Sequence, residues 1–226
     1  MHALQLPLSL RLRDDAFFDN FFIGNNAQVV STLQLRTEQF IYCYGEAGCG
    51  RTHLLQACCH AAEKDKAIFY LPLSNYDEFS PEIFESLEDQ SRVCIDDVDF
   101  IIGNQKWEEA LFYFYNRARD KNVSLLMSAK IPPQQLSCVL PDLKSRLTSA
   151  LILEIKNLSD TEKMQALQMR AQLRGLQLSE DVANYLIHHY SRNMRDLFMV
   201  FEKLDHASLV AKRRLTIPFA KSVLAG

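Results

Sequence analysis

The sequence has few glycines, no paired cysteine motif and no long apolar segment. Only seven of its 226 residues are glycine. Its six cysteines form no Cys-x-x-Cys pair and no Cys/His cluster with zinc-finger spacing, which argues against a zinc site. No apolar run reaches membrane-spanning length, and no basic leader precedes the apolar N-terminal residues. These absences predict a cytoplasmic protein with reduced, structural cysteines and no role at a membrane.

The sequence also has no excess of positive charge. The formal net charge is -3 at pH 7, from 25 Lys and Arg against 28 Asp and Glu. Proteins that bind nucleic acid through bulk electrostatics usually have a basic face, so the net charge argues against that mode of binding and leaves a local basic patch as the alternative. The length suits one large domain or a domain and a half.

Short β-branched and aromatic runs alternate with helical patterns in the first two thirds of the chain. Such alternation predicts a parallel sheet with helices on both faces, which is an α/β fold. A short apolar run that ends in glycine or in charged residues is typical of a buried strand. The five expected strands are residues 39–45, 67–72, 91–97, 124–130 and 150–155.

The pattern changes after Ile155. Ser159 is a predicted helix N-cap, Glu162 its capping-box partner and Gly175 the stop signal. Further helical patterns follow, which predicts a small all-helical domain. The predicted division is an extended arm at 1–12, an α/β domain at 13–156 and a helical lid domain at 157–226.

The stretch GEAGCGRTH, residues 45–53, lies between the first expected strand and a helix. Gly45, Gly48 and Gly50 have the spacing of a phosphate-binding loop, in which backbone N–H groups point at the phosphates. Thr52 stands where a hydroxyl would hold Mg²⁺. A glycine-rich tight turn is the alternative, and the flanking strand and helix favour the nucleotide site.

Arg51 stands where such a loop usually has lysine. Arginine keeps the charge but is longer, planar and forked. We therefore expect Arg51 to bind the nucleotide and to crowd the γ-phosphate position, so that the site favours a diphosphate and hydrolyses slowly or not at all. The loop residues expected at the nucleotide are Gly45, Gly48, Cys49, Gly50, Arg51, Thr52 and His53.

An acidic pair, Asp96 and Asp97, ends the third expected strand. At the carboxyl end of a strand beside the loop, ATPases use such a pair to hold Mg²⁺ and to orient a water. We assign Asp96, together with Thr52, to the metal and Asp97 to polarising the water. Alone, two aspartates at the end of a strand are commonly a solvated turn, and the loop favours the catalytic interpretation.

Six segments together resemble the AAA+ replication initiator (DnaA) family. They are long, keep their order and span nearly the whole chain. Within that family, the length, the loop arginine and the N-terminal arm are most similar to the smaller regulators of initiator inactivation. The segments are FFDNFFIGNN, GEAGCGRTHLL, VCIDDVDFI, IPPQQLSCVLPDLKSRL, RGLQLSEDVANYLIHHYSRNMRDL and KRRLTIPF.

The resemblance implies roles for further residues. LPDLKSRL is similar to the segment with an arginine finger, here Arg146, which completes a neighbour's active site in trans. NMRDL is similar to the second sensor motif, with Arg195 reaching the nucleotide from the lid. FFDNFFIG is similar to the linker that wraps the base, which implies base contacts by Phe21, Phe22 and Ile23.

The chain departs from the family pattern at the first sensor. The family usually has an acidic residue where this chain has Ala129, and Ser128 is a weak substitute. Together with Arg51, this departure argues against hydrolysis in the chain's own site. The initiator also has a helix-turn-helix DNA reader after the lid, whereas this sequence ends at Gly226, so we expect only indirect contact with DNA.

The N-terminal stretch QLPLSL resembles the short peptides that bind the bacterial sliding clamp. In such a contact, Leu6, Leu8 and Leu10 would fill an apolar groove, and the amide of Gln5 would fix the orientation. A disordered tail or an edge strand is the alternative.

These features predict a nucleotide-bound regulator that binds the DNA-loaded clamp, contacts the ATP-bound initiator and inserts Arg146 to trigger hydrolysis there. The implied cofactor is ADP or another nucleoside diphosphate, with or without Mg²⁺, and a homodimer is a further expected assembly. Two alternatives stay open. One is a self-hydrolysing AAA+ ATPase such as a helicase loader, and the other is a structural clamp-binding module with a vestigial pocket.

Overall fold

The computed structural model describes residues 12–13, 15–61, 67–85 and 87–224. The clamp-binding prediction for Gln5, Leu6, Leu8 and Leu10 therefore lies outside the described residues. The chain divides into two compact units. The first comprises Met1–Phe21, Asn26–Glu46 and Gly50–Lys156, and the second comprises Phe22–Asn25, Ala47–Cys49 and Asn157–Gly226.

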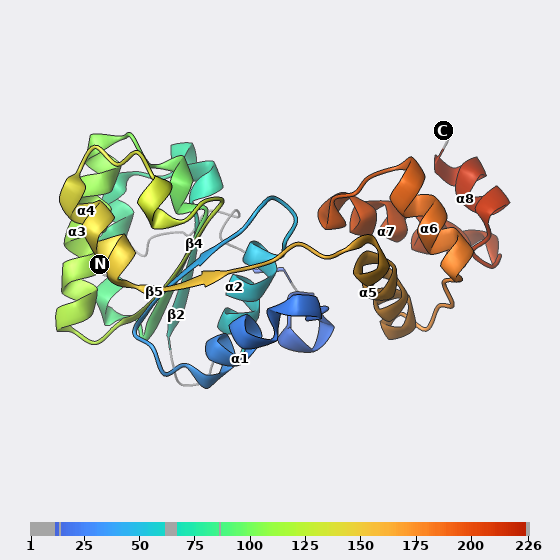
Figure 1. Ribbon diagram of the computed structural model, residues 1–226, viewed down its shortest axis with the longest axis horizontal. Coiled ribbons are helices and arrows are strands. Elements are labelled where there is room, and N and C mark those ends of the chain that lie inside the picture. The colour runs from blue at the N-terminus through green and yellow to red at the C-terminus, as the bar shows by residue number, and fades with distance from the viewer. Residues whose placement is uncertain (1–11, 14, 62–66, 86, 225–226) are drawn as a thin grey trace. The chain divides into compact units, whose positions relative to one another are not determined.

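A five-stranded sheet forms the centre of the first unit (Figure 1). Every neighbouring pair of strands is parallel, so the carboxyl ends of the strands lie along one edge. The third strand is buried along its whole length, as expected for a strand covered on both faces. In spatial order the strands are β2 (Ile68–Pro72), β3 (Arg92–Asp96), β4 (Ser124–Ala129), β1 (Phe40–Tyr44) and β5 (Leu151–Glu154).

Helices cover both faces of this sheet, which confirms the predicted fold class (Figure 1). One face is covered by α1 (Ala27–Leu35) and α2 (Arg51–His60), and the other by α3 (Gln105–Asp120) and α4 (Pro141–Ser149). The core under α3 and α4 includes the fully buried side chains of Leu111, Phe114 and Leu147.

The connection between β2 and β3 contains short 3-10 helices, for which the sequence pattern predicted no element. They are η4 (Leu73–Glu78), η5 (Pro81–Phe84) and η6 (Leu87–Asp89). Phe84 of η5 stacks on Phe114 of α3, with ring centroids 5.5 Å apart. This connection therefore adds apolar surface to the core under α3.

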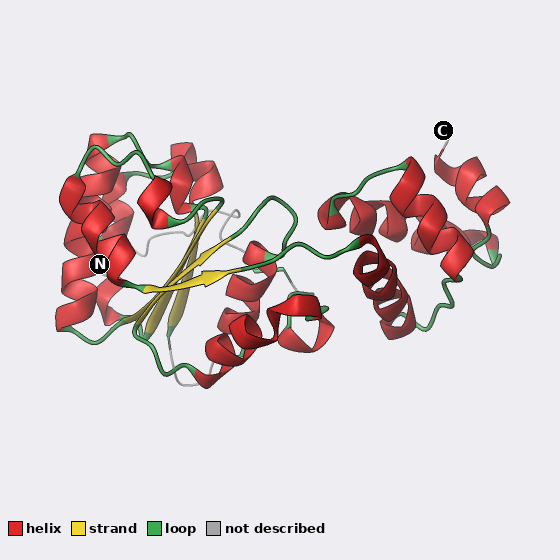
Figure 2. Ribbon diagram, in the orientation of Figure 1, coloured by secondary structure: helices red, strands yellow, loops and turns green. Residues whose placement is uncertain are grey.

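The second unit contains α-helices and, within its described residues, no strand (Figure 2). The predicted capping box is present, since the Ser159 hydroxyl accepts the Glu162 N–H at 3.3 Å and the Glu162 carboxylate accepts the Ser159 N–H at 2.8 Å. Gly175, at φ 72°, follows the end of the first of these helices. The helices are α5 (Asp160–Leu173), α6 (Glu180–His189), α7 (Met194–Ala211) and α8 (Ile217–Leu224).

The core of the second unit is built from apolar residues on the inner faces of its helices. Leu167, Leu186, Leu197 and Phe201 are fully buried there. In the described part of the chain, no helix combines the length and the apolar character that a bilayer crossing requires.

Candidate functional site

The loop between β1 and α2 has the backbone geometry of a phosphate-binding loop. Gly48 has φ 85° and Gly50 has φ 102°, conformations that residues with a side chain rarely adopt. A Cβ atom on Gly50 would lie 2.6 Å from Cε2 of Phe21, so a larger residue does not fit there. The Gly45 N–H donates to the carbonyl of Ala129 at 3.3 Å, which ties the start of the loop to the end of β4.

The loop leaves backbone donors open at the start of α2. The N-cap residue is Gly50, which has no side chain to cap the helix. Within the described residues, no hydrogen bond is made by the N–H groups of Gly48, Gly50 and Thr52. Such N–H groups carry the positive end of the helix dipole and attract anions. The residues present therefore fit the phosphate groups of a nucleotide.

The side chain of Arg51 points toward Gly45 and Asp97 and not toward solvent. Its side chain is buried, Nη2 donates to Oδ1 of Asp97 at 2.8 Å, and Nη1 donates to the carbonyl of Gly45. Its Nε is buried and has no hydrogen-bond partner among the residues that the structure describes. Because an unsatisfied buried donor is costly, a phosphate oxygen within reach of Nε would be stabilised there.

Asp96 and Asp97 end β3 with different partners. Asp96 is 2% exposed, and its Oδ2 accepts the hydroxyl of Tyr70 at 2.9 Å while its Oδ1 accepts the hydroxyl of Ser128. Asp97 adopts the left-handed conformation, with φ 57° and ψ 50°, and its N–H donates to the Ser128 hydroxyl at 3.1 Å. Ser128, on β4, thus links the two aspartates directly.

Tyr70 was not predicted as part of the site. Its one signal in the sequence is its place in the second expected strand, close to the carboxyl end. The parallel register pairs Tyr70 with Cys94 and Pro72 with Asp96, which brings the tyrosine hydroxyl to the end of β3. That register follows from the strand order, which no local sequence pattern indicates.

Burial changes the pKa values of two groups in this cluster, Asp97 and Tyr70. Burial and the neighbouring Asp96 carboxylate raise the pKa of Asp97 to about 6, against the opposing effect of Arg51. Burial, together with the charge of Asp96, raises the pKa of Tyr70 well above its ordinary value. Tyr70 therefore stays a neutral hydroxyl that donates to Asp96.

The predicted metal ligands fit Mg²⁺ only as part of a nucleotide complex. In the ranges that the structure describes, no group of three or more His, Cys, Asp or Glu side chains is arranged to hold a metal ion. Mg²⁺ at a phosphate-binding site needs few protein ligands, because phosphates and waters supply the others. Each oxygen of Asp96 accepts one side-chain hydroxyl and keeps a further lone pair, and Thr52 is half-buried beside the loop.

The residues predicted to contact the base lie in different surroundings. Phe21 packs against His53, with ring centroids 5.5 Å apart, and Nε2 of His53 lies 2.8 Å from the carbonyl oxygen of Phe17. Phe22 packs against the helical core of the second unit, and the side chain of Ile23 is 43% exposed. Contact of these residues with a base stays a prediction.

The remaining predicted residues are Cys49, Arg146 and Arg195. Cys49 is buried in the loop. Arg146 lies half-buried in the last turn of α4, and its guanidinium makes no ion pair or hydrogen bond with any described residue. Arg195 is exposed in the first turn of α7, where its backbone N–H donates to Oδ1 of the N-cap Asn193 at 2.9 Å. The roles predicted for these side chains stay predictions.

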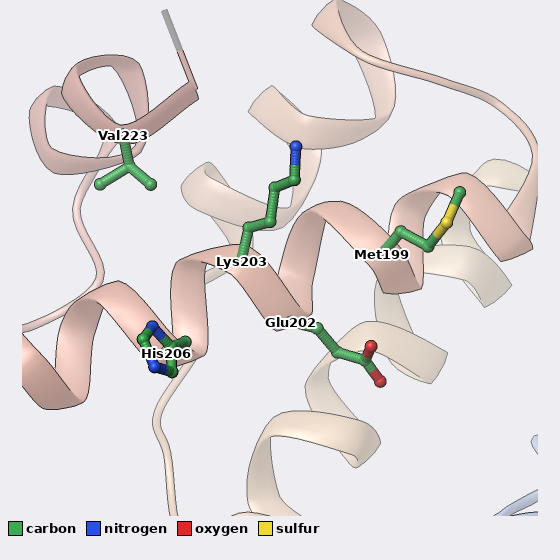
Figure 3. A pocket seen from close by; sticks show the side chains of 5 residues that line it. All are labelled: Met199, Glu202, Lys203, His206 and Val223. Atoms are coloured by element: carbon green, nitrogen blue, oxygen red, sulfur yellow. The ribbon is translucent and has the colours of Figure 1, made fainter. Parts of the chain in front are cut away.

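A hollow of about 620 Å³ lies on the surface of the second unit (Figure 3). Lys203 and Glu202 point to different sides of α7, so the polar groups of the hollow do not converge on one point (Figure 3). A ligand site usually has a few convergent polar groups, which makes the loop the stronger candidate. The hollow is lined by Met199, Glu202, Lys203, His206 and Val223.

Comparisons with known proteins agree with this geometry. The family model of the bacterial DnaA ATPase domain matches residues 12–154, and the model of the Hda lid domain matches residues 160–224. Domain III of the replication initiation protein DnaA from Thermotoga maritima has a TM-score of 0.80 at 21% identity, with 95% of this chain and 98% of that chain covered.

Two further solved structures have the same fold. AMPPCP-bound DnaA from Aquifex aeolicus has a TM-score of 0.71 at 21% identity, with 86% of this chain and 66% of that chain covered. The RuvB Holliday junction branch migration motor from Thermotoga maritima has a TM-score of 0.65 at 16% identity, with 88% of this chain and 66% of that chain covered. The parallel sheet, the glycine loop and the matched residues together show that this chain belongs to the bacterial DnaA ATPase-domain family of AAA+ proteins, with a lid domain similar to that of Hda.

Proposed function

We propose that this chain is a nucleotide-bound regulator of replication initiation that stimulates ATP hydrolysis by the initiator. The observation that carries the proposal is the contrast between two arginines. Arg51 is paired with Asp97 at 2.8 Å, whereas the guanidinium of Arg146 has no acidic partner among the described side chains. A half-buried cation without an internal counter-charge is available to the phosphates of a partner's nucleotide, which is the role of an arginine finger.

The chain's own site is proposed to hold ADP, or another nucleoside diphosphate, and to turn over slowly. Asp97 would have to polarise the attacking water, yet its carboxylate is already paired with Arg51. The open N–H groups of the loop and Nε of Arg51 would bind the phosphates, and Thr52 and Asp96 would hold Mg²⁺ where it accompanies the nucleotide. The base contacts of Phe21, Phe22 and Ile23 and the sensor role of Arg195 belong to the same proposal.

Two partner contacts complete the proposal. Gln5, Leu6, Leu8 and Leu10 would bind the sliding clamp, so that DNA is contacted only through the clamp. A homodimer formed through AAA+ contacts is a further assembly that we propose, and the cytoplasm is the proposed compartment. Changing Gln5 and Leu6 to alanine should abolish clamp binding while the circular dichroism spectrum stays unchanged.

The decisive experiment measures ATP hydrolysis by the initiator with and without this protein and the DNA-loaded clamp. We expect stimulation by the wild type, on the order of 10³-fold for an intact finger, and its loss in Arg146→Ala. The matched control is Arg119→Ala on α3, whose guanidinium is paired with Asp120 at 3.5 Å. An Arg146→Ala protein that stimulates as well as the wild type would refute the finger.

The self-hydrolysing ATPase remains the second candidate, because the chain retains Asp96, Asp97 and Thr52. Turnover by the purified protein alone separates the two functions. Calorimetry with ADP and ATP sharpens the test, since an arginine in place of the usual lysine is expected to crowd the γ-phosphate and to favour the diphosphate. A clear ATP preference with brisk turnover would favour the ATPase over the regulator.

A further inference from the structure

Glu108 is a fully buried carboxylate on α3, with no exposed surface. Its Oε1 accepts the backbone N–H groups of Gly103 at 2.7 Å and Val139 at 3.1 Å, and its Oε2 accepts the N–H of Leu140 at 2.7 Å. A buried carboxylate is tolerated only when hydrogen bonds replace its water, and three amide donors do so here. Both oxygens are therefore engaged by the backbone.

The donors belong to two segments that are far apart in the sequence. Val139 and Leu140 directly precede α4, whose first residue is Pro141. The helix bearing Arg146 therefore has its start held by a side chain from α3. Its inner face is fixed by Leu143 and Leu147, which are both fully buried.

Gly103, the third donor, belongs to the segment that follows Asp96 and Asp97 in the chain. The 3-10 helix η7 (Val98–Phe100) begins directly after Asp97. The Phe100 N–H donates to the Asp97 carbonyl at 3.1 Å, and the Ile101 N–H donates to the Val98 carbonyl at 3.2 Å. A single carboxylate thus joins the segment after the nucleotide-site aspartates to the start of the helix with the proposed finger.

We propose that Glu108 is the positioning residue of the arginine finger. By holding the start of α4, it fixes the position of the Arg146 guanidinium. The inference rests on the function proposed for Arg146 and adds the group that holds its helix. Arg146 lies six residues after Leu140, a rise of about 9 Å along a helix, so a shift at the start of α4 carries through to the guanidinium. A displacement of about 1 Å at a catalytic group can lower the rate about 100-fold.

The test variant is Glu108→Gln, which keeps the shape of the side chain. Its amide nitrogen is a donor, so at least one of the three backbone N–H groups loses its acceptor. The matched control is Glu109→Gln, which makes the same charge change at the adjacent residue. The Glu109 carboxylate accepts the side-chain amide of Gln105 at 2.8 Å, at the surface of α3.

The readout is the rate of ATP hydrolysis by the initiator as a function of the concentration of this protein, with DNA-loaded clamp present. For Glu108→Gln we expect the maximal stimulated rate to fall about tenfold or more, while the half-saturating concentration stays that of the wild type. Glu109→Gln should match the wild type in both. Amide hydrogen exchange should accelerate in residues 136–146 and 101–104 alone.

Two outcomes would overturn the inference. One is an unchanged maximal rate in Glu108→Gln. The other is a lost rate together with faster exchange throughout the first unit, which would reduce Glu108 to a general structural role. If Glu108→Gln does not fold, Val139→Pro decides by the same criteria, because it removes one donor and replaces a side chain that is 54% exposed.

The activities of Arg146→Ala and Glu108→Gln together distinguish failure of the proposed function from failure of the positioning role. An Arg146→Ala protein that stimulates like the wild type would remove the finger, and the positioning role with it. An inactive Arg146→Ala combined with a fully active Glu108→Gln would remove the positioning role of Glu108 alone.

Discussion

The helices of the two units begin in different ways. In the second unit, α5, α6 and α7 each start at a residue whose side chain accepts an N–H group of the first turn, namely Ser159, Ser179 and Asn193. In the first unit, no N-cap side chain makes such a bond at the described starts of α1 to α4. There, Glu108 from α3 holds the start of α4, and the start of α2 is left open beside the loop. Local side chains thus cap α5, α6 and α7 of the helical unit, whereas the start of α4 in the α/β unit is held by a side chain from another helix.

The largest expected effect separates the two units by their cores. Phe114 in the first unit and Phe201 in the second are both fully buried, and loss of such a side chain costs about 3–5 kcal/mol. Because a domain of this small size has only a few kcal/mol of stability, Phe201→Ala should unfold the helical unit at 37 °C. Phe114→Ala should lower only the midpoint of the larger unit.

Differential scanning calorimetry measures this prediction directly, as two transitions that respond separately. A single transition that shifts equally in both variants would show that the two units unfold together. The units would then have no separate free energies of unfolding to compare.

A second pair compares two glycines with positive φ. In Gly50→Ala, at φ 102°, the new Cβ would lie 2.6 Å from the ring of Phe21, so we expect a loss of about 2–3 kcal/mol and of nucleotide binding. In Gly175→Ala, at φ 72°, the Cβ meets no described atom within 4 Å, and we expect about 1 kcal/mol. Chemical denaturation and calorimetric titration with ADP provide the measurements. Equal losses for the two would argue against a close approach at the loop.

A third pair tests the capping contrast itself. Ser159→Ala should destabilise the helical unit by about 1 kcal/mol, because the hydroxyl caps α5. Asn104→Ala should cost less than about 0.5 kcal/mol, because the exposed Asn104 makes no side-chain cap bond to α3. Denaturant midpoints of the two transitions measure both values. Similar costs would mean that the first unit also uses local caps.

The smallest expected effect is a pH dependence confined to the second unit. Hydrogen bonds from the backbone N–H and hydroxyl of Ser159 lower the pKa of Glu162 below its ordinary value. A carboxyl with a lowered folded-state pKa adds stability above pH 4.5, and this contribution is lost as the pH falls through the folded-state pKa. Glu162→Gln should flatten that slope in thermal unfolding of the helical unit, and an unchanged slope would contradict the assignment.

Prediction from the sequence succeeded where the signal is local. The five strands, the glycine loop and the box formed by Ser159 and Glu162 are each encoded within a few neighbouring residues, and the structure contains them. Periodicity and capping are short-range effects, so one sequence is enough to detect them.

Contacts across the sheet escaped prediction. Tyr70 and Ser128 donate hydrogen bonds to Asp96 only because β2 and β4 lie on either side of β3. The sequence of a single strand does not indicate which strands will lie beside it. Glu108 has no local signature, since an acidic residue in the first turn of a helix is ordinarily solvated. Its role follows from the loop before α4 folding back onto α3.

The left-handed backbone conformation of Asp97 limits which side chains can replace it. Asparagine adopts this conformation about as readily as aspartate, whereas most side chains do not. Asp97→Asn can therefore erase the charge opposite Arg51 while the hydroxyl of Ser128 keeps its backbone donor. The bend tolerates an amide at this position, so Asp97→Asn separates the effect of the charge from the effect of the backbone shape.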